Sequence, residues 1–465
     1  MKIRIKKSRI VLLTLAVLLV GLPPVFGMLT ESAVRNQAET LRNEGRLLVT
    51  VEEYDRGWFS SRALLSIAPS PDGDPDRQAL IGFVEPMTVV VDFEHGPLSV
   101  QSGIFFGFSE LHARPALSAD GTLLDAPFDF EFHAQSNFGG TLNFAGEVRP
   151  FDSAGPGFAL SSSGGRFHGT VAGARTQVEV DAETLQLTQG DVTYSLLGVR
   201  GAADTERVSR YVMPGVMTLE IDRMAMDREA AEQRTVFDVR ALAAEYSTAL
   251  DDARSRLEGA VKVGLERLRL GSDTEVTNAR VETAAERIDV AALAAYLSAA
   301  ERAAENGLPF ADEVEPALMR LLAEGPAITL DTLRFDMNGE ALEANAEATV
   351  DPASLSGASA TDLGDPTLWM RVLDGRAELV VAKTLAEEIA VSIAKAQIGG
   401  GVAGDDSMPG QSVDALARAQ AGLAIAVLAA QGVLEDTGDA YRTELRLEKG
   451  SVAVNGQRLP FFGLQ

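Results

Sequence analysis

The stretch APFDFEFHAQSNFGGTLNFAGEV, residues 126–148, decides the fold class. Phe128, Phe130 and Phe132 alternate with polar residues, so apolar and polar side chains point to opposite sides of an extended backbone. Glycine and asparagine then interrupt the alternation, as they do where two antiparallel strands meet. The stretch therefore predicts antiparallel sheet with one face in water.

The same period of two residues continues outward on both sides of this stretch. It runs through residues 47–52, 61–67 and 87–100 before it, and through 164–199 and 215–227 after it. Residues 236–270 are rich in helix formers, but Val261, Val263 and Leu265 alternate, and we predict strands there too. Residues 149–157 are expected to be a loop because they are rich in proline and glycine.

Beyond residue 289 the apolar period changes to that of helices. Helices are predicted at 290–305 and 310–325, and a hairpin at 327–350 has Asn338-Gly339 at its turn. The order then recurs, with a strand at 375–381, helices at 382–396 and 413–434, and a hairpin at 441–460.

The first 29 residues predict a membrane anchor. Five basic residues precede the uncharged stretch 10–29, which is long enough to span a bilayer. The basic residues should stay in the cytoplasm, which places the rest of the chain outside. A cleaved signal peptide is the alternative, since Val25-Phe26-Gly27 is an acceptable cleavage site.

Together these patterns predict an α+β fold: an N-terminal transmembrane helix followed by a long, mainly antiparallel β-sheet with two helical pairs in the C-terminal half. We expect three parts. Residues 1–29 form the cytoplasmic basic tail and the anchor, and residues 30–288 form the mainly antiparallel β body. Residues 289–465 form two strand-helix-helix-hairpin units that continue the sheet.

Composition excludes several classes of function. The chain carries a net charge of -26, which repels phosphate backbones and argues against nucleic-acid binding. It has no cysteine, so disulfides, thiolate metal sites and cysteine nucleophiles are excluded. Residues 72–76, DGDPD, have some likeness to a calcium loop but lack the spacing of one.

The stretch EYDRGWFSSRALLSIAP, residues 53–69, has the look of an active-site signature but lies where two strands should meet. Gly57 suits a tight turn, and Trp58 and Phe59 begin the return strand and are expected to cover the core. Ser60 and Ser61 are expected to have no nearby histidine that could activate them. We therefore interpret the stretch, Tyr54 included, as a structural hairpin.

The four histidines show no metal-ligand spacing, so no metal and no cofactor are expected. His133 and His168 fall on the polar side of their strands. His95, Gly96 and Pro97 are interpreted as a turn before a strand rather than as a general-base loop.

Residues 413–434 predict an apolar helix with a seam of Leu416, Leu423, Val427 and Leu434. The seam is expected to pack on the sheet. The alternatives are a dimer surface or a cover over an apolar groove.

Three short stretches carry a family resemblance: YDRGWFSSRALL at 54–65, FEHGPL at 93–98, and a final GSVAVNGQRLP that holds Asn455 and Gly456, preceded by EGPAITLDTLRF at 324–335. This layout resembles the YdgA-type family of bacterial envelope proteins, whose function is unknown. The resemblance implies an inner-membrane anchor, a periplasmic body and self-association, and it supplies no catalytic residues.

We therefore expect a non-enzymatic cell-envelope protein, anchored in the bacterial inner membrane by a single helix, with its body in the periplasm. Its sheet is expected to bind a protein partner or an acyl-chain ligand, or to close by forming a homodimer. The alternative is a carboxylate-dependent enzyme that acts on an envelope polymer.

Overall fold

The computed structural model describes residues 23–36, 38–39, 47–69, 86–96, 98–99, 105–117, 128–155, 157–228, 236–271, 274–306, 313–401 and 410–458. Contacts between residues divide the chain into two compact units, Met1–Asp204 and Thr205–Gln465. Each unit is described by itself.

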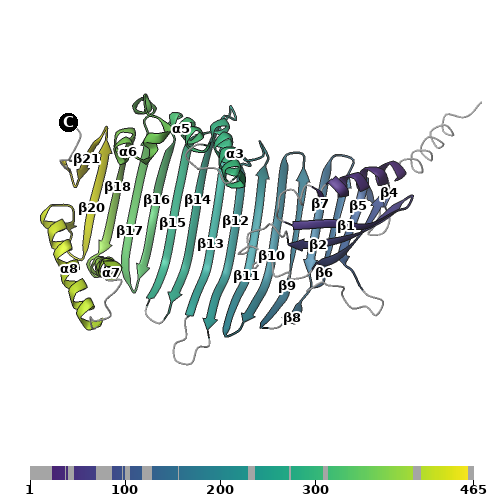
Figure 1. Cartoon of the computed structure of the whole chain (residues 1–465), viewed down its shortest axis with the longest axis horizontal. Coiled ribbons are helices and arrows are strands. Elements are labelled where there is room, and N and C mark those ends of the chain that lie inside the picture. Colours follow the sequence, from purple (N-terminus) through teal and green to yellow (C-terminus); the bar gives the residue numbers. More distant parts are fainter. Residues whose placement is uncertain are drawn as a thin grey trace, which may run out of the picture. The chain divides into compact units, whose positions relative to one another are not determined.

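The first unit is antiparallel sheet with one helix at residues 23–36, here called the N-terminal helix (purple in Figure 1). Its strands are β1 (Leu47–Arg56), β2 (Ser60–Pro69), β3 (Met87–His95), β4 (Leu98–Ser99), β5 (Phe105–Pro115), β6 (Phe130–Asn137), β7 (Thr141–Val148), β8 (Phe151–Gly155), β9 (Phe158–Ala172) and β10 (Arg175–Gln189), and β11 (Val192–Glu206) crosses the unit boundary.

Most neighbouring strands of the first unit follow the chain order. The pairings are β1–β2, β2–β3, β3–β5, β5–β6, β6–β7, β7–β9 and β9–β10, all antiparallel, and β4 and β8 pair with β5 and β9. Strand β8 corrects the loop predicted at 149–157: Phe151 and Asp152 pair with Ser162 and Ser161, which satisfies backbone groups at the edge of the sheet.

One face of this sheet is closed by apolar packing over β1–β6. Ala63, Val89, Val91 and Phe93 are buried in one cluster, and Val34 of the N-terminal helix packs against it. Alternate residues of β2 and β3 point to this side, so one helix can cover both strands. The core of the first unit therefore lies between the N-terminal helix and β1–β6.

Aromatic rings extend the same face over β6, β7 and β9. The centroids of the Phe132 and Phe167 rings lie 6.0 Å apart, with Gly146 paired between these two residues on β7. A Cβ on Gly146 would lie 2.4 Å from Cζ of Phe167, so the ring occupies the place of the missing side chain. Such glycine–aromatic pairs fix the register of neighbouring strands.

The second unit is also antiparallel. Its strands are β12 (Gly215–Arg228), β13 (Val236–Leu250), β14 (Arg256–Leu270), β15 (Thr274–Asp289), β16 (Ala327–Met337), β17 (Glu340–Val350), β18 (Leu373–Ala382), β19 (Glu435–Asp436), β20 (Ala440–Glu448), β21 (Ser451–Val454) and β22 (Gln457–Arg458). Consecutive strands from β12 to β18 pair, then β18 pairs with β20, β20 with β21, and β21 with β22.

The predicted strands at 236–270 are confirmed as β13 and β14. Their helix-forming residues are overridden because β13 is hydrogen-bonded along both sides, to β12 and to β14. The hairpin turn at Asn338-Gly339 is also confirmed. Both residues have positive φ, 52° and 90°, as a two-residue hairpin turn requires.

Helices of the second unit lie at opposite ends of its strands (Figure 1). They are α3 (Val290–Asn306), α5 (Glu315–Ala323), α6 (Pro366–Val372), α7 (Lys383–Gly401) and α8 (Gly410–Ala430), with short 3₁₀ helices at Pro352–Leu355 and Ala360–Gly364. Leu322 of α5 and Val372 of α6 are buried with Val350, at one end of β17. Leu385 of α7 is buried with Leu342, at the other end of β17.

The mainly antiparallel fold is as predicted, but the placement of helices differs. Residues 352–372 add helical turns that were not predicted, each begun by an aspartate or serine cap such as Asp351, whose side chain accepts from the Ala353 amide. Among the described residues, the one helix long and apolar enough to cross a membrane is Val413–Ala430, not a segment at the N-terminus. Residues 10–22 of the predicted anchor lie outside the described part of the chain.

Candidate functional site

A row of polar residues crosses the first unit on the side opposite its core. Asp92, His112, His133, Ala145 and His168 lie directly opposite one another on β3, β5, β6, β7 and β9. Directly opposed residues of antiparallel strands point to the same face. The fold thus brings three of the four histidines of the chain into one line, and His133 and His168 are on the polar side, as predicted.

Ala145 leaves room in this row. Between and beside the histidines lies a hollow of about 650 Å³, lined by Asp92, His112, Ala113, Arg114, Glu131, Phe132, His133, Ala145, Gly146, Glu147, Arg166, Phe167 and His168. Its rim is charged in both signs. Arg62 and Arg114 pair with Asp92 at 2.6 and 3.4 Å, and Arg149 pairs with Glu131 at 2.5 Å. Two of the carboxylates are therefore neutralised by neighbouring guanidinium groups.

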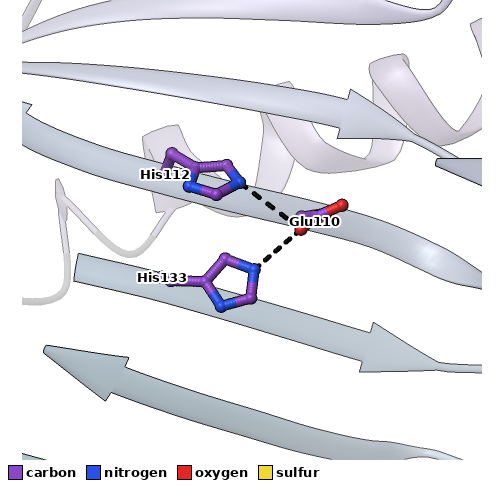
Figure 2. Close-up of side chains that lie close together, drawn as sticks. All are labelled: Glu110, His112 and His133. Atoms are coloured by element: carbon purple, nitrogen blue, oxygen red, sulfur yellow. Dashed lines mark hydrogen bonds and ion pairs between the residues drawn. The ribbon is translucent and has the colours of Figure 1, made fainter. Parts of the chain in front are cut away.

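Three side chains at one end of the row converge more closely (Figure 2). Glu110 Oε1 lies 2.7 Å from His133 Nε2 and 3.4 Å from His112 Nε2. Gln135 Nε2 donates to the same oxygen at 3.1 Å. The Glu110 side chain is fully buried, so these contacts replace the water that an exposed carboxylate would have.

This cluster was not predicted from the sequence. Glu110 and His112 are two residues apart on β5, which puts them on one face, but His133 is 21 residues further along the chain. The pairing of His112 with His133 depends on the register between β5 and β6, which includes a shift between Gly107 and Ser109. The only signal in the sequence was the alternation of each strand taken alone.

The hairpin stretch at 53–69 and the HGP stretch at 95–97 meet at a buried pair of side chains, Ser61 and His95. Ser61 Oγ and His95 Nε2 lie 2.7 Å apart, and both side chains are buried. The prediction that no histidine is close to the serines is therefore wrong for Ser61. Burial lowers the pKa of His95, which keeps the imidazole neutral at pH 7.

This pair lacks the surroundings of a nucleophile and base. His95 Nδ1 has no hydrogen-bond partner, so no acid orients the ring as in a triad. Gly27 of the N-terminal helix lies against the ring: a Cβ there would be 3.1 Å from Nε2. Ser61 and His95 therefore hold the hairpin and the helix together, which agrees with the structural interpretation.

The other predicted motif residues take varied positions. Gly57 N donates to Ser60 O at 2.8 Å across the turn, and Tyr54 packs on Phe93. A Cβ on Gly96 would lie 1.7 Å from Gly107 O, so only glycine lets the end of β3 approach β5. Pro97 lies outside the described residues.

Trp58 and Phe59 do not cover the core. Their side chains are 56% and 54% exposed at the tip of the β1–β2 hairpin. The prediction failed because β1 ends at Arg56 and β2 begins only at Ser60, so both residues lie in the turn and not in the return strand.

Asn455 and Gly456 form the turn between β21 and β22 with positive φ values of 48° and 76°. Asn455 Oδ1 accepts from Glu444 N at 2.7 Å, and its Nδ2 donates to Gly432 O at 2.9 Å. This motif therefore ties the segment after α8 to the last hairpin.

The predicted seam on α8 is not packed on the sheet. Leu416, Leu423 and Val427 are exposed, Leu423 by 67%, and Leu434 beyond the helix is half-buried. The buried positions of α8 are Ala417, Ala421 and Ile425. Helix α8 packs against α7, and small alanines let the two backbones approach, which turns the leucines outward.

These observations define a class: a two-unit antiparallel β protein with helices at the strand ends and a histidine-rich hollow in its first unit. The family model described as "Bacterial protein of unknown function (DUF945)" matches residues 5–461, so the chain belongs to this family. No curated protein sequence and no solved structure matches the chain.

Proposed function

We propose that this protein is anchored in the bacterial inner membrane and binds an acyl chain on the open apolar face of its second unit in the periplasm. The observation that carries the proposal is a set of apolar side chains, 36% to 59% exposed, on a single face of the sheet. We call this set the apolar strip; it consists of Met217, Leu219, Tyr246, Val261, Ile328, Leu379 and Leu445.

Register shows that the strip is continuous from β12 to β20. Met217 lies opposite Tyr246, which lies opposite Val261. Further along, Ala377 on β18 lies opposite Leu445 on β20. A bulge between Leu330 and Leu333 keeps both leucines of β16 opposite alanines of β17, so the strip is not interrupted there.

Helices limit the strip at both ends. Leu342 and Val350, the buried ends of β17, contact α7 and the α5–α6 cluster respectively. Between them, Ala344, Ala346 and Ala348 lie on the same face. Small side chains in the middle and helices at the ends suit a flexible hydrocarbon chain lying across the strands.

The opposite face of the same strands is laced with ion pairs. Lys262 pairs with Glu245 at 3.1 Å, Arg376 with Glu347 at 3.1 Å, and Arg442 with Glu378 at 2.7 Å. A charged face stays in water, so it supplies solubility while the strip stays available to an apolar ligand.

A photo-cross-linking amino acid tests this proposal in full-length protein made in a bacterial host. The probe replaces Leu445 of the strip or, one residue on, Arg446 of the opposite face. We expect adducts with the mass of a lipid at Leu445 and none at Arg446. Protein adducts at Leu445 would support a protein partner instead, and equal labelling of both positions would contradict a specific apolar site.

The anchor is supported by aromatic residues at one edge of the first unit. Phe26 of the N-terminal helix contacts Phe108, which contacts Phe138, with centroids 5.3 and 4.8 Å apart. The exposed Trp58 and Phe59 belong to the same edge, because Phe59 O accepts from His95 N and Gly96 N donates to Phe108 O.

This edge lies where the uncharged stretch 10–22 leads into the helix. Aromatic residues gather at membrane–water interfaces, so this edge suits contact with lipid headgroups. We expect the full-length protein to remain in membranes after a carbonate wash, and release by the wash would contradict the anchor.

A carboxylate-dependent enzyme ranks second. The hollow in the first unit supplies carboxylates beside open space, and Glu147 lines it on an exposed stretch of β7. Asp92 and Glu131 are held in ion pairs with arginines, which suits support of the sheet better than proton transfer.

A further inference from the structure

We propose that Glu110, His112 and His133 form a binding site for one Zn²⁺ ion. Their ligand atoms, one carboxylate oxygen and one nitrogen from each imidazole, all lie within 4.8 Å of one another. In a tetrahedral zinc site with bonds of about 2.0–2.1 Å, neighbouring donor atoms are roughly 3.3 Å apart. The present separations are therefore close to those of a zinc site.

The backbone already holds the three residues in the arrangement that a zinc site needs. Glu110 and His112 are two residues apart on β5 and so share one face, and His133 lies opposite His112 on β6. The two imidazole rings are 4.6 Å apart at an interplanar angle of 34°, and both Nε2 atoms point toward Glu110 Oε1 (Figure 2). Ligands on paired strands are rigid, so little entropy is lost when the ion binds.

His112 also points to a metal ion, independently of the spacing of the three residues. Its Nε2 atom is buried and makes no hydrogen bond, although it lies 3.4 Å from Glu110 Oε1. A buried polar atom without a partner costs free energy, and a metal ion would use its lone pair. His133 Nε2 lies 2.7 Å from the same Glu110 oxygen; a ring that binds zinc through Nε2 carries its proton on Nδ1.

The donor set selects the metal. Two neutral imidazoles and one carboxylate form a common set for zinc with an open fourth position. His112 and His133 both line the 650 Å³ hollow, so water or a small anionic ligand can reach that position. Gln135 donates to Glu110 at 3.1 Å and would orient the carboxylate without binding the ion itself.

The test uses full-length protein purified without a histidine tag, treated with chelator and titrated with ZnCl₂. We expect one Zn²⁺ per chain, and at least tenfold weaker binding for His112→Ala and for His133→Ala. His168→Ala is the matched control. His168 lies in the same row of the same face, but it pairs with Glu179 at 3.4 Å and is outside the cluster. This control should bind zinc like the unmodified protein.

Two results would overturn the proposal: substoichiometric zinc in the unmodified protein, or a loss in His168→Ala as large as in His112→Ala. If the alanine variants unfold, the spectra of Co²⁺ bound to the unmodified protein test the site instead. Four-coordinate Co²⁺ gives intense visible bands, and X-ray absorption should show two imidazoles. A spectrum of aqueous octahedral Co²⁺ would refute the site.

Discussion

The two units share one architecture and treat its two faces in opposite ways. In the first unit the apolar face is packed over β1–β6, with Val91 and Phe93 buried, while the polar face buries the carboxylate of Glu110. In the second unit the polar face is mostly exposed ion pairs, and the apolar strip is open by a third or more of each side chain. Alternation along a strand defines two faces, but it does not determine which face is covered.

The difference indicates where each unit carries chemistry. A closed apolar face allows ionisable groups to be held rigidly on the other side, as in the Glu110 cluster. An open apolar face offers surface to a hydrophobic ligand instead.

The largest effect is expected for Phe93→Ala, at the centre of the closed face. Phe93 is 3% exposed, and loss of a buried phenyl ring costs about 3–5 kcal/mol. Phe59→Ala, at an exposed position of the same unit, should change stability by less than about 0.5 kcal/mol. Urea unfolding monitored by circular dichroism compares the two, and similar losses would remove the basis for calling this face closed.

Asp238 is the buried carboxylate of the second unit, where it pairs with Arg223 at 2.8 Å and Arg240 at 3.3 Å. Asp238→Asn should destabilise the unit by about 1–3 kcal/mol, because the charge-assisted hydrogen bonds from Arg223 and Arg240 are weakened. Burial by itself raises the pKa of Asp238, but the two guanidinium groups outweigh it and hold the pKa below its usual value.

The sign of the pH effect follows from this lowered pKa. The stabilisation is present above the unfolded-state pKa, about 3.9, and is lost as pH falls through the folded-state value. Acid titration of unfolding should therefore show a shallower loss below about pH 4 in Asp238→Asn than in the unmodified protein. Parallel curves would mean that the carboxylate is not held by these arginines.

Ser61→Ala is expected to cost about 1 kcal/mol through the lost hydrogen bond to His95. The lowered pKa of His95 gives a pH effect of the same sign as that of Asp238, but in a window at higher pH. The unfolded chain takes up a proton more readily, so stability falls as pH drops below the unfolded-state value of about 6.5.

His95→Gln is the matched variant for this window. The difference between the melting temperatures at pH 7.5 and pH 5.5 should be smaller in His95→Gln than in the unmodified protein. An unchanged difference would show that His95 is solvated rather than sealed beneath the N-terminal helix.

The smallest change in stability is expected for Leu423→Lys on α8. This side chain is 67% exposed, so unfolding should shift by less than about 0.5 kcal/mol. Unfolding experiments do not test the predicted homodimer through α8. Light scattering of the full-length protein in detergent does, and it should show weaker self-association in this variant. Ala421→Lys, at a buried position of the same helix, should unfold more easily. An unchanged dimer in Leu423→Lys would rule out α8 as its interface.

Several errors of the sequence analysis have the same origin. Trp58 and Leu423 were expected to pack because they are large and apolar, yet both are exposed. Apolar character shows a tendency to be buried, but the turn at Gly57 and the alanines of α8 determine which side chains find a neighbour. The candidate site was missed for a related reason, because its residues come from two strands.

Local structure could be predicted from neighbouring residues in the chain. The two-residue period predicted the strands, including β13 and β14, and Asn338-Gly339 predicted its turn, because side-chain direction and backbone conformation depend on near neighbours in the chain. The contacts of His133 with Glu110 and of Ser61 with His95 depend instead on how the strands pair in three dimensions. Strand register joins residues that are distant in the sequence, and a shift of one residue would send every side chain of a strand to the other face.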